Sequence, residues 1–381
     1  MQTYVPRNCE TIIKKHLTSF PCVTLLGSRQ VGKSTLAKRI ISAIPGSIYL
    51  DLEDPRDLNK LNDPLAFLEA NKDYLICIDE VQRLPEIFQI FRTYLDQTKR
   101  PGQLLLLGSA SKELIRQSSE SLAGRISYLE ISPFIASEVE DLPRLWLQGG
   151  YPDSYLKDPE LSFDWRINYI RTFLEMDIPA LGIGIPAETL KRFWTMLAHL
   201  NGGLLNSAKL ASSMGLSAPT IKRYLDILEG TFVIRQLKPF YTNTKKRLIK
   251  SPKVYIRDSG LVHCLLGVES YNDLLGHPVL GSSYESFILE SILPQFPRHT
   301  PSFYRSSSGA EIDLVLEKGN HTIAIEIKSS ANPALTQGFF EAQKIVCPDK
   351  SFIIAPIDKP YPYKKDVWVY NLQDFIQQGL R

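Results

Sequence analysis

A short glycine-containing stretch, GSRQVGKS at residues 27–34, constrains the fold of this chain more than any other feature. Its spacing is G-x-x-x-x-G-K-[ST], with an apolar run at 22–26 before it and a helix-forming run at 35–41 after it. The predicted order is strand, loop and helix. In that setting glycine lets consecutive backbone N–H groups and the helix N-terminus point at one anion. The pattern therefore predicts a phosphate-binding loop rather than a chance turn.

The residues of this loop have distinct expected roles. The side chain of Lys33 is expected to reach the β- and γ-phosphates of a nucleotide, and the hydroxyl of Ser34 to ligate Mg²⁺. We therefore expect ATP and Mg²⁺ as cofactors. The complete set of expected nucleotide-binding residues is Gly27, Ser28, Arg29, Gln30, Val31, Gly32, Lys33, Ser34 and Thr35.

A second apolar run, at 74–78, ends in the acidic pair Asp79-Glu80. A nucleotide site needs one acid to hold the metal and another to activate water, so we assign Asp79 to Mg²⁺ and Glu80 to the water. An apolar strand that ends in two acids can also be a strand meeting solvent. The strand expected at 47–52, between the loop and the pair, favours the nucleotide site.

Two further residues are candidates for catalysis beside Lys33 and Glu80. Ser109 follows a buried strand at 103–107, and at that tip it would position water or sense the γ-phosphate. Arg125 precedes the next strand and would reach into a neighbouring subunit's site, which it suits better than Arg116. A serine in an ordinary turn and an arginine in a surface salt bridge remain the alternatives.

The whole chain sets broad limits on its class. Its 381 residues allow two or three domains, and the net charge of +3 means that any basic surface must be local. The five cysteines have no C-x-x-C spacing, which indicates reduced thiols in a cytosolic protein. No apolar run reaches 18 residues, so we expect a cytoplasmic protein without a membrane partner.

The order of phosphate loop, Asp-Glu strand, polar strand tip and arginine resembles the AAA+ ATPase superfamily. The exact residues of several motifs resemble those of one prokaryotic family, in which an AAA-type domain precedes a C-terminal domain of unknown function related to restriction-type nucleases. The resemblance covers nearly the full chain. The strings that carry it are GSRQVGKS, DEVQ at 79–82, LGS at 107–109, SLAGR at 121–125, QGGYP at 148–152, YIRTFLEMDIP at 169–179 and KVYIRDSGL at 253–261.

Residues 134–200 are expected to form a helical lid over the nucleotide. Two amphipathic helices are predicted there, at 145–156 and 167–178. A lid arginine that contacts nucleotide would be Arg166 or Arg171, and the sequence does not choose between them.

The pattern between 204 and 257 predicts a winged helix-turn-helix. A helix at 204–214, a turn at Gly215 and an N-cap at Ser217 lead into a second helix that ends near 228. Strands at 232–237 and 254–256 would form the wing, and eight Lys or Arg without any acid lie between 230 and 257. DNA is the expected partner, although a winged helix can also dock a protein. The expected DNA-binding residues are Thr220, Lys222, Arg223, Lys245, Lys246 and Arg247.

The C-terminal region combines a helix at 281–293 with a hairpin of strands at 311–317 and 321–328. The apolar residues 312, 314 and 316 would share one face and put Asp313 on the other. This arrangement resembles the PD-(D/E)xK nuclease superfamily, with Ile312 in place of the leading proline. The resemblance implies Mg²⁺ ligands Glu285, Asp313 and Glu326, with Lys328 orienting water and Gln343 and Lys344 supporting the site. Solvated charges on a strand face are the alternative.

We thus predict an α/β chain in four parts. A parallel-sheet P-loop AAA+ domain would span 1–132, a helical lid 133–200, a winged helix-turn-helix 201–257, and an α/β restriction-nuclease-like domain 258–381. The leading functional hypothesis is a Mg²⁺-dependent ATPase that acts on DNA. The alternatives are an ATP-dependent protein-interaction switch with a catalytically silent C-terminal domain, and an ATP-gated DNA nuclease. A protein partner and a homo-oligomer are left open.

Overall fold

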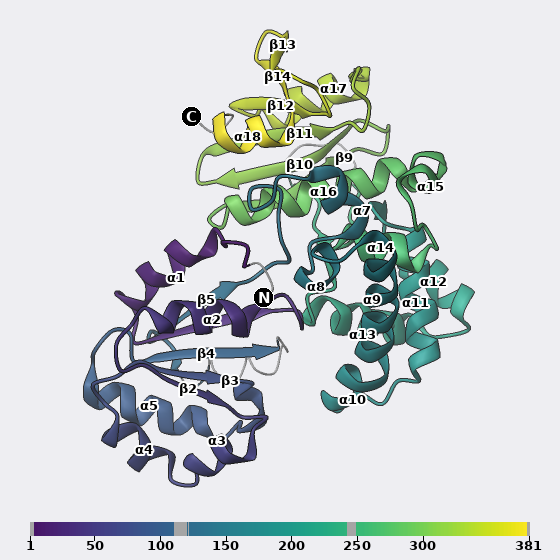
Figure 1. The fold of residues 1–381 in the computed structure, drawn as a ribbon. Helices are drawn as coiled ribbons and strands as arrows, with labels where there is room; N and C mark the ends of the chain where they lie inside the picture. The colour runs from purple at the N-terminus through teal and green to yellow at the C-terminus, as the bar shows by residue number, and fades with distance from the viewer. Residues whose placement is uncertain (1–3, 110–119, 121, 242–248, 379–381) are drawn as a thin grey trace. The chain divides into compact units, whose positions relative to one another are not determined.

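The computed structural model describes residues 4–109, 120, 122–241 and 249–378 (Figure 1). The chain divides into two compact units. The first comprises Met1–Phe134 with Gly230–Phe232, and the second comprises Ile135–Glu229 with Val233–Arg381. The further division of the second unit into lid, winged helix and C-terminal domain stays a prediction.

The first unit contains a five-stranded parallel sheet in the order β2-β3-β4-β1-β5. Near-continuous apolar runs form its central strands, as expected for a parallel sheet that is buried on both faces. Strand β4 lies between β1 and β3, and its last residue, Ser109, pairs in register with Gly27. The strands are β1 (Cys22–Gly27), β2 (Ile48–Asp51), β3 (Ile76–Asp79), β4 (Leu104–Ser109) and β5 (Ile126–Glu130).

One helix of this unit, α2, follows the phosphate loop as the sequence predicted. Helices α3 and α4 each begin with a proline preceded by an aspartate cap, Asp54 or Asp63. The helices are α1 (Cys9–Leu17), α2 (Lys33–Ser42), α3 (Pro55–Lys60), α4 (Pro64–Ala70), the short η1 (Val81–Arg83) and α5 (Ile87–Thr98).

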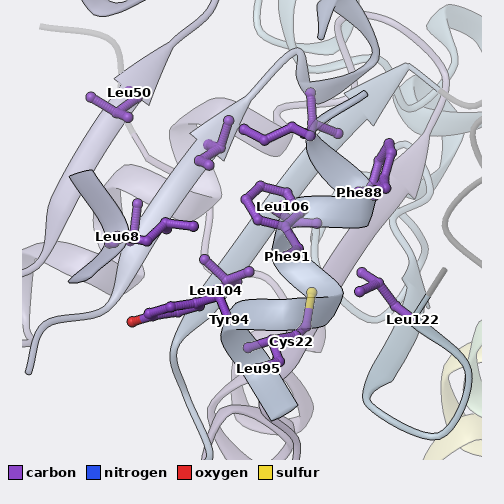
Figure 2. Packing of buried hydrophobic residues seen from close by; sticks show 14 of the residues in the cluster. Cys22, Leu50, Leu68, Phe88, Phe91, Tyr94, Leu95, Leu104, Leu106 and Leu122 are labelled. Carbon is purple, nitrogen blue, oxygen red and sulfur yellow. The ribbon is translucent and has the colours of Figure 1, made fainter. Parts of the chain in front are cut away.

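Helix α5 supplies much of the core of the first unit. Phe88, Phe91 and Leu95 recur at helical spacing and are almost completely buried. They belong to one cluster with Leu104 and Leu106 of β4 (Figure 2). This packing holds the strands that end at the predicted nucleotide site.

The second unit begins with helices that differ from the predicted pair. Residues 145–156 are not one helix, because α7 ends at Gln148, its C-cap Gly149 has a φ of 78°, and α8 starts at Pro152. A Cβ on Gly149 would lie 2.1 Å from Asp258 Oδ1, so both the positive φ and the close packing require glycine here. The elements are α7 (Leu142–Gln148), α8 (Pro152–Tyr155), α9 (Pro159–Thr172), the π-helical η2 (Phe173–Asp177), α10 (Ile178–Ala180) and α11 (Ala187–His199).

Two helices and a three-stranded antiparallel sheet follow, in the order β6-β8-β7. Gly215 has φ 65° at the end of α12, and Ser217 Oγ accepts a 3.3 Å hydrogen bond from the amide of Thr220, as the turn and cap predicted. Helix α12 starts later than expected because 203–204 pair with β8. The elements are β6 (Gly203–Leu204), α12 (Ser207–Met214), α13 (Ala218–Gly230), β7 (Ile234–Leu237) and β8 (Lys253–Ile256).

The remaining residues form a six-stranded mixed sheet in the order β13-β14-β12-β11-β10-β9, with helices before and between its strands. The predicted hairpin is β10 and β11, but a register irregularity follows Ile312. As a result Ile312 and Val315 share a core cluster, and the expected alternation through 314 and 316 was wrong. The elements are α14 (Ser259–Leu265), α15 (Tyr271–Gly276), α16 (Leu280–Ile292), η3 (Leu293–Gln295), β9 (Thr300–Arg305), β10 (Glu311–Lys318), β11 (His321–Ile327), α17 (Gln337–Val346), β12 (Lys350–Ile354), β13 (Tyr361–Lys364), β14 (Val367–Tyr370) and α18 (Leu372–Gln378).

Within the described parts of the chain, no helix combines the length and apolar character needed to cross a bilayer. None of the five cysteines is in a disulfide.

Candidate functional site

The phosphate loop connects β1 to α2, as the sequence predicted. A Cβ on Gly27 would lie 2.3 Å from the carbonyl oxygen of Ile131, so the strand must end in glycine. Gly32 has φ 90° and forms the N-cap of α2 without a side-chain acceptor. The first N–H groups of a helix have no acceptor within it, and here no capping side chain serves them, which is the geometry of an anion site.

Lys33 lies inside the loop. Its side chain is buried, and Nζ donates hydrogen bonds to the carbonyl oxygens of Gly27, at 3.0 Å, and Ser28, at 2.9 Å. Burial lowers the pKa of Lys33 to about 8, although Glu80 and Asp79 act in the opposite direction. The amine is therefore mostly protonated at neutral pH and is held at the loop.

The two acids at the end of β3 have different surroundings. Asp79 is buried; its Oδ2 accepts a 2.6 Å hydrogen bond from the hydroxyl of Tyr49, and its Oδ1 accepts one of 2.9 Å from the amide of Glu80. Glu80 has a left-handed backbone, with φ 54°, and its carboxylate accepts a hydrogen bond from Gln82. Burial and the nearby Asp79 raise the pKa of Glu80. Asp79 is fixed in place, whereas Glu80 is turned out of the strand direction.

The sequence interpretation missed Tyr49 and Gln82 as partners of these acids. Gln82 follows the pair closely, so its nearness was a usable signal. Tyr49 is on β2, and only the strand order puts it beside β3.

Hydroxyl and carboxylate oxygens of the kind that Mg²⁺ prefers flank the loop. Ser34 is the second residue of α2 and is partly exposed, and Asp79 ends β3. The residues present fit a Mg²⁺ ion held by these two side chains.

The structure puts the two remaining catalytic candidates at opposite edges of the sheet. Ser109 ends β4 between β1 and β3, at the carboxyl edge where the loop and the acids lie. Arg125 immediately precedes β5, and β5 runs parallel to β1 with Ile126 paired to Cys22, so Arg125 is at the amino edge. Its Nε donates a 2.5 Å hydrogen bond to Asp96. Arg116 is outside the described residues.

The two candidate lid arginines are bound within the second unit. Arg166 is buried and donates to the carbonyl oxygens of Leu147, at 3.2 Å, and Gly260, at 2.9 Å. Arg171 pairs at 3.1 Å with Glu175 on the surface. These contacts give Arg166 a structural role and leave Arg171 as a surface ion pair.

In the C-terminal region the predicted metal ligands lie together, but a lysine is among them. Lys253 of β8 is 3% exposed at its side chain, and its Nζ lies 2.8 Å from Glu311, 2.9 Å from Glu285 and 3.4 Å from Asp313. Tyr255 donates a 2.5 Å hydrogen bond to Glu285. We call Lys253, Glu285, Glu311 and Asp313 the lysine–carboxylate cluster.

Glu326 and Lys328 adjoin this cluster. Lys328 Nζ donates a 2.7 Å hydrogen bond to Glu326 Oε1, and Glu326 Oε2 is buried without a hydrogen-bond partner among the described residues. Burial, Asp313 and Glu285 raise the pKa of Glu326 to about 8, and Lys328 opposes them. Asp313 Oδ2 also accepts a 3.0 Å hydrogen bond from the amide of Ile327. Asp313 is therefore buried rather than on a solvated strand face.

The predicted supporting residues do not join the cluster. Gln343 donates a 2.9 Å hydrogen bond to Ser351, and Lys344 is exposed. No group of three or more His, Cys, Asp or Glu side chains that could hold a metal ion occurs in the described ranges.

The basic stretch between 230 and 257 is partly neutralised. Glu290 of α16 accepts hydrogen bonds from Arg235, at 2.9 Å, and Arg257, at 3.1 Å. With Lys253, three of the five basic residues of this stretch that the structure describes are thus bound by acids. Lys238 and Lys250 are exposed.

The predicted DNA-binding residues are only partly described. Lys222 and Arg223 are exposed on α13, and Thr220 is partly buried with its hydroxyl 2.8 Å from that of Ser217. Lys245, Lys246 and Arg247 lie outside the described residues. The local charge argument for DNA is therefore weaker than the sequence indicated.

Comparisons with known proteins agree with the P-loop fold of the first unit. A family model described as an AAA domain matches residues 19–140, and two domains of unknown function, DUF8612 and DUF4143, match 139–272 and 280–375. A Walker-type ATPase of Pyrococcus abyssi, PABY2304, superimposes with a TM-score of 0.50 at 15% identity, over 69% of this chain and 96% of that one. At this identity the likeness concerns the fold alone. The family match, the fold and the loop together make the first unit a P-loop ATPase-like domain of the AAA type.

Uncharacterised proteins of Mycobacterium bovis and Mycobacterium tuberculosis are each 38% identical to the chain over 376 residues. The matched region is 98% of this chain and 85% of each relative. The chain belongs to the same family as these two mycobacterial proteins.

Proposed function

We propose that the first unit binds ATP with Mg²⁺ and hydrolyses it. The observation that carries the proposal is the convergence of the phosphate loop, Asp79 and Glu80 at one edge of a parallel sheet. Open amides and the Lys33 ammonium bind the phosphates, while Ser34 and Asp79 hold the metal. Mg²⁺ supplies charge stabilisation at the β- and γ-phosphates when it is bound.

The hydrolytic step follows from the acids and the strand tip. Glu80 accepts a proton from the attacking water, for which its raised pKa makes it a stronger base than an ordinary glutamate. Ser109 ends β4 between β1 and β3, and we assign to it the orienting of that water. Lys33 exchanges its bonds to Gly27 and Ser28 for bonds to phosphate oxygens.

Two substitutions test the site by separating binding from turnover. Lys33→Ala should abolish ATP binding measured by calorimetry, and Glu80→Gln should bind ATP with little phosphate release. Lys14→Ala and Glu86→Gln remove matched charges from exposed side chains in the same unit. Normal hydrolysis in both site variants would refute the proposal.

We further propose that the ATPase acts on DNA through the second unit. The support is the pair of helices α12 and α13 with Lys222 and Arg223 exposed, beside the antiparallel strands β7 and β8. An electrophoretic shift with linear, single-stranded and branched DNA at two salt concentrations tests this. Alanine at Lys222, Arg223, Lys245, Lys246 and Arg247 should weaken the shift and flatten its salt dependence.

A second candidate is an ATP-dependent switch that binds a protein partner. The observation in its favour is that Lys253, Arg235 and Arg257 are already paired with acids, which reduces the charge left for DNA. Absence of any shift, or a shift unchanged in the alanine variant, favours the switch. The third alternative, an ATP-gated nuclease, predicts plasmid cutting with Mg²⁺ or Mn²⁺ that Asp313→Ala removes.

A further inference from the structure

The carboxylates of the lysine–carboxylate cluster are arranged around one positive charge, and a side chain of the protein, Lys253, supplies that charge. Carboxylates from two different elements, helix α16 and strand β10, surround one ammonium group. The contact to Glu285, at 2.9 Å, is a charge-assisted hydrogen bond of ordinary length, and the contact to Glu311, at 2.8 Å, is an ion pair. The ammonium thus occupies the space between Glu285 and β10.

The lysine is charged in this position. Burial lowers the pKa of Lys253, but the carboxylates of Glu285, Asp313 and Glu311 outweigh burial and hold it well above its ordinary value. Removing such an amine would leave carboxylates buried together without compensation, which is costly.

The charges around the cluster are close to balanced without a metal. The acids are Glu285, Glu311, Asp313 and Glu326, and the cations that contact them are Lys253, Lys328 and Arg305. A divalent ion would need carboxylate oxygens at about 2.0–2.6 Å. The ammonium of Lys253 already lies 2.8–3.4 Å from oxygens of Glu285, Glu311 and Asp313 and is their cation. The resemblance to metal-dependent nucleases implies a Mg²⁺ ion here, and these residues do not fit one.

We propose that Lys253 is the resident cation of this cluster and excludes divalent metal from it. Glu326 Oε2 is buried beside the cluster with no hydrogen-bond partner in the described structure, so an incoming ion would find at least this carboxylate oxygen without a donor. Strand β8 is also bound to α16 through Tyr255 and Glu285, so the amine is held in place by more than its own ion pairs. The cluster therefore joins β8, α16 and β10 instead of performing metal-dependent chemistry.

Manganese binding to the full chain tests this proposal directly. All variants carry Asp79→Asn and are studied without nucleotide, so that the site of the first unit does not bind the ion. Mn²⁺ binding is measured by calorimetry with and without Asp313→Asn. The two variants should bind the same amount of Mn²⁺, because the cluster holds none. A Mn²⁺ site in the lysine-containing chain that is lost in the Asp313→Asn variant would overturn the proposal.

Replacing the lysine supplies the converse measurement. Lys253→Met keeps the length of the side chain and removes its charge. In EDTA this variant should unfold at a lower temperature than the lysine-containing chain, and adding Mn²⁺ should raise its unfolding temperature. Adding Asp313→Asn should remove that dependence on Mn²⁺. Lys253→Arg, which keeps the charge, should show no dependence on Mn²⁺.

If Lys253→Met unfolds at the same temperature in EDTA and in Mn²⁺, or if Lys253→Arg gains a Mn²⁺ site, Lys253 is not the group that excludes the metal. Should Lys253→Met fail to fold, the first measurement still decides.

Discussion

The hydroxyl of Tyr49 donates a 2.6 Å hydrogen bond to Asp79 Oδ2, which fixes the proposed metal ligand from the neighbouring strand. Tyr49 is on β2 and Asp79 ends β3, and these strands are adjacent in the parallel sheet. A buried carboxylate that keeps this bond is held in one orientation. In the proposed site Tyr49 is therefore a positioning residue that orients Asp79 and does not itself touch nucleotide.

Tyr49→Phe should weaken metal use more than nucleotide binding. Loss of one hydrogen bond to a carboxylate costs about 1.5–3 kcal/mol, so we expect the Mg²⁺ concentration at half-maximal hydrolysis to rise by about 10- to 100-fold. Hydrolysis measured against Mg²⁺ at saturating ATP gives this value. Tyr74→Phe, at a tyrosine that is 45% exposed, is the matched control. An unchanged Mg²⁺ dependence would remove Tyr49 from the site.

The pKa of Lys33 predicts that ATP affinity falls in alkaline solution. Burial lowers this pKa to about 8, and only the protonated amine attracts phosphate. Between pH 7 and pH 9 the protonated fraction falls about tenfold, so the dissociation constant for ATP should rise by up to about tenfold. Calorimetry across this range measures it. Affinity that is constant from pH 7 to pH 9 would show that the amine does not lose its proton there.

Local patterns were sufficient to predict the phosphate loop, the acid pair and the cap at Ser217, because each depends on residues close together in the chain. The role of Lys253 was not predictable in this way, since its partner Glu285 is on another element and the lysine precedes an apolar strand that the sequence assigned to a DNA-binding wing. The contact between Tyr49 and Asp79 was not predicted, because it depends on β2 lying next to β3, and strand order is a property of the tertiary structure. The helix break at Gly149 was signalled locally by Gly149, Gly150 and Pro152, whereas the approach of Asp258 to Gly149 was not.

The position of Arg125 leads to a prediction about assembly. Because it lies at the amino edge of the sheet and bonds to Asp96, it cannot reach the phosphate loop of its own subunit, about 20 Å away along β1 at ordinary strand rise. If Arg125 serves a neighbour's site, Lys33→Ala and Arg125→Ala should each be inactive alone and recover hydrolysis when mixed. Asp96→Asn, which frees the arginine, should retain activity. Full activity of Arg125→Ala alone would assign the residue to a structural ion pair.

Glu290 should contribute stability to the second unit that is lost in acid. Burial raises its pKa, but Arg235 and Arg257 outweigh burial and hold the pKa below its ordinary value of 4.5. A carboxylate with a depressed pKa stabilises the fold at pH above 4.5 and loses this contribution as the pH falls through the folded pKa. Glu290→Gln leaves two partly buried guanidinium groups without their anion, and we expect it to lower the free energy of unfolding at pH 7 by about 3 kcal/mol.

Urea unfolding at pH 7 and at acid pH measures both effects, with the exposed Glu188→Gln as control. The difference between wild type and Glu290→Gln should shrink toward acid pH, and a difference that stays constant would mean that the glutamate's charge does not stabilise this cluster.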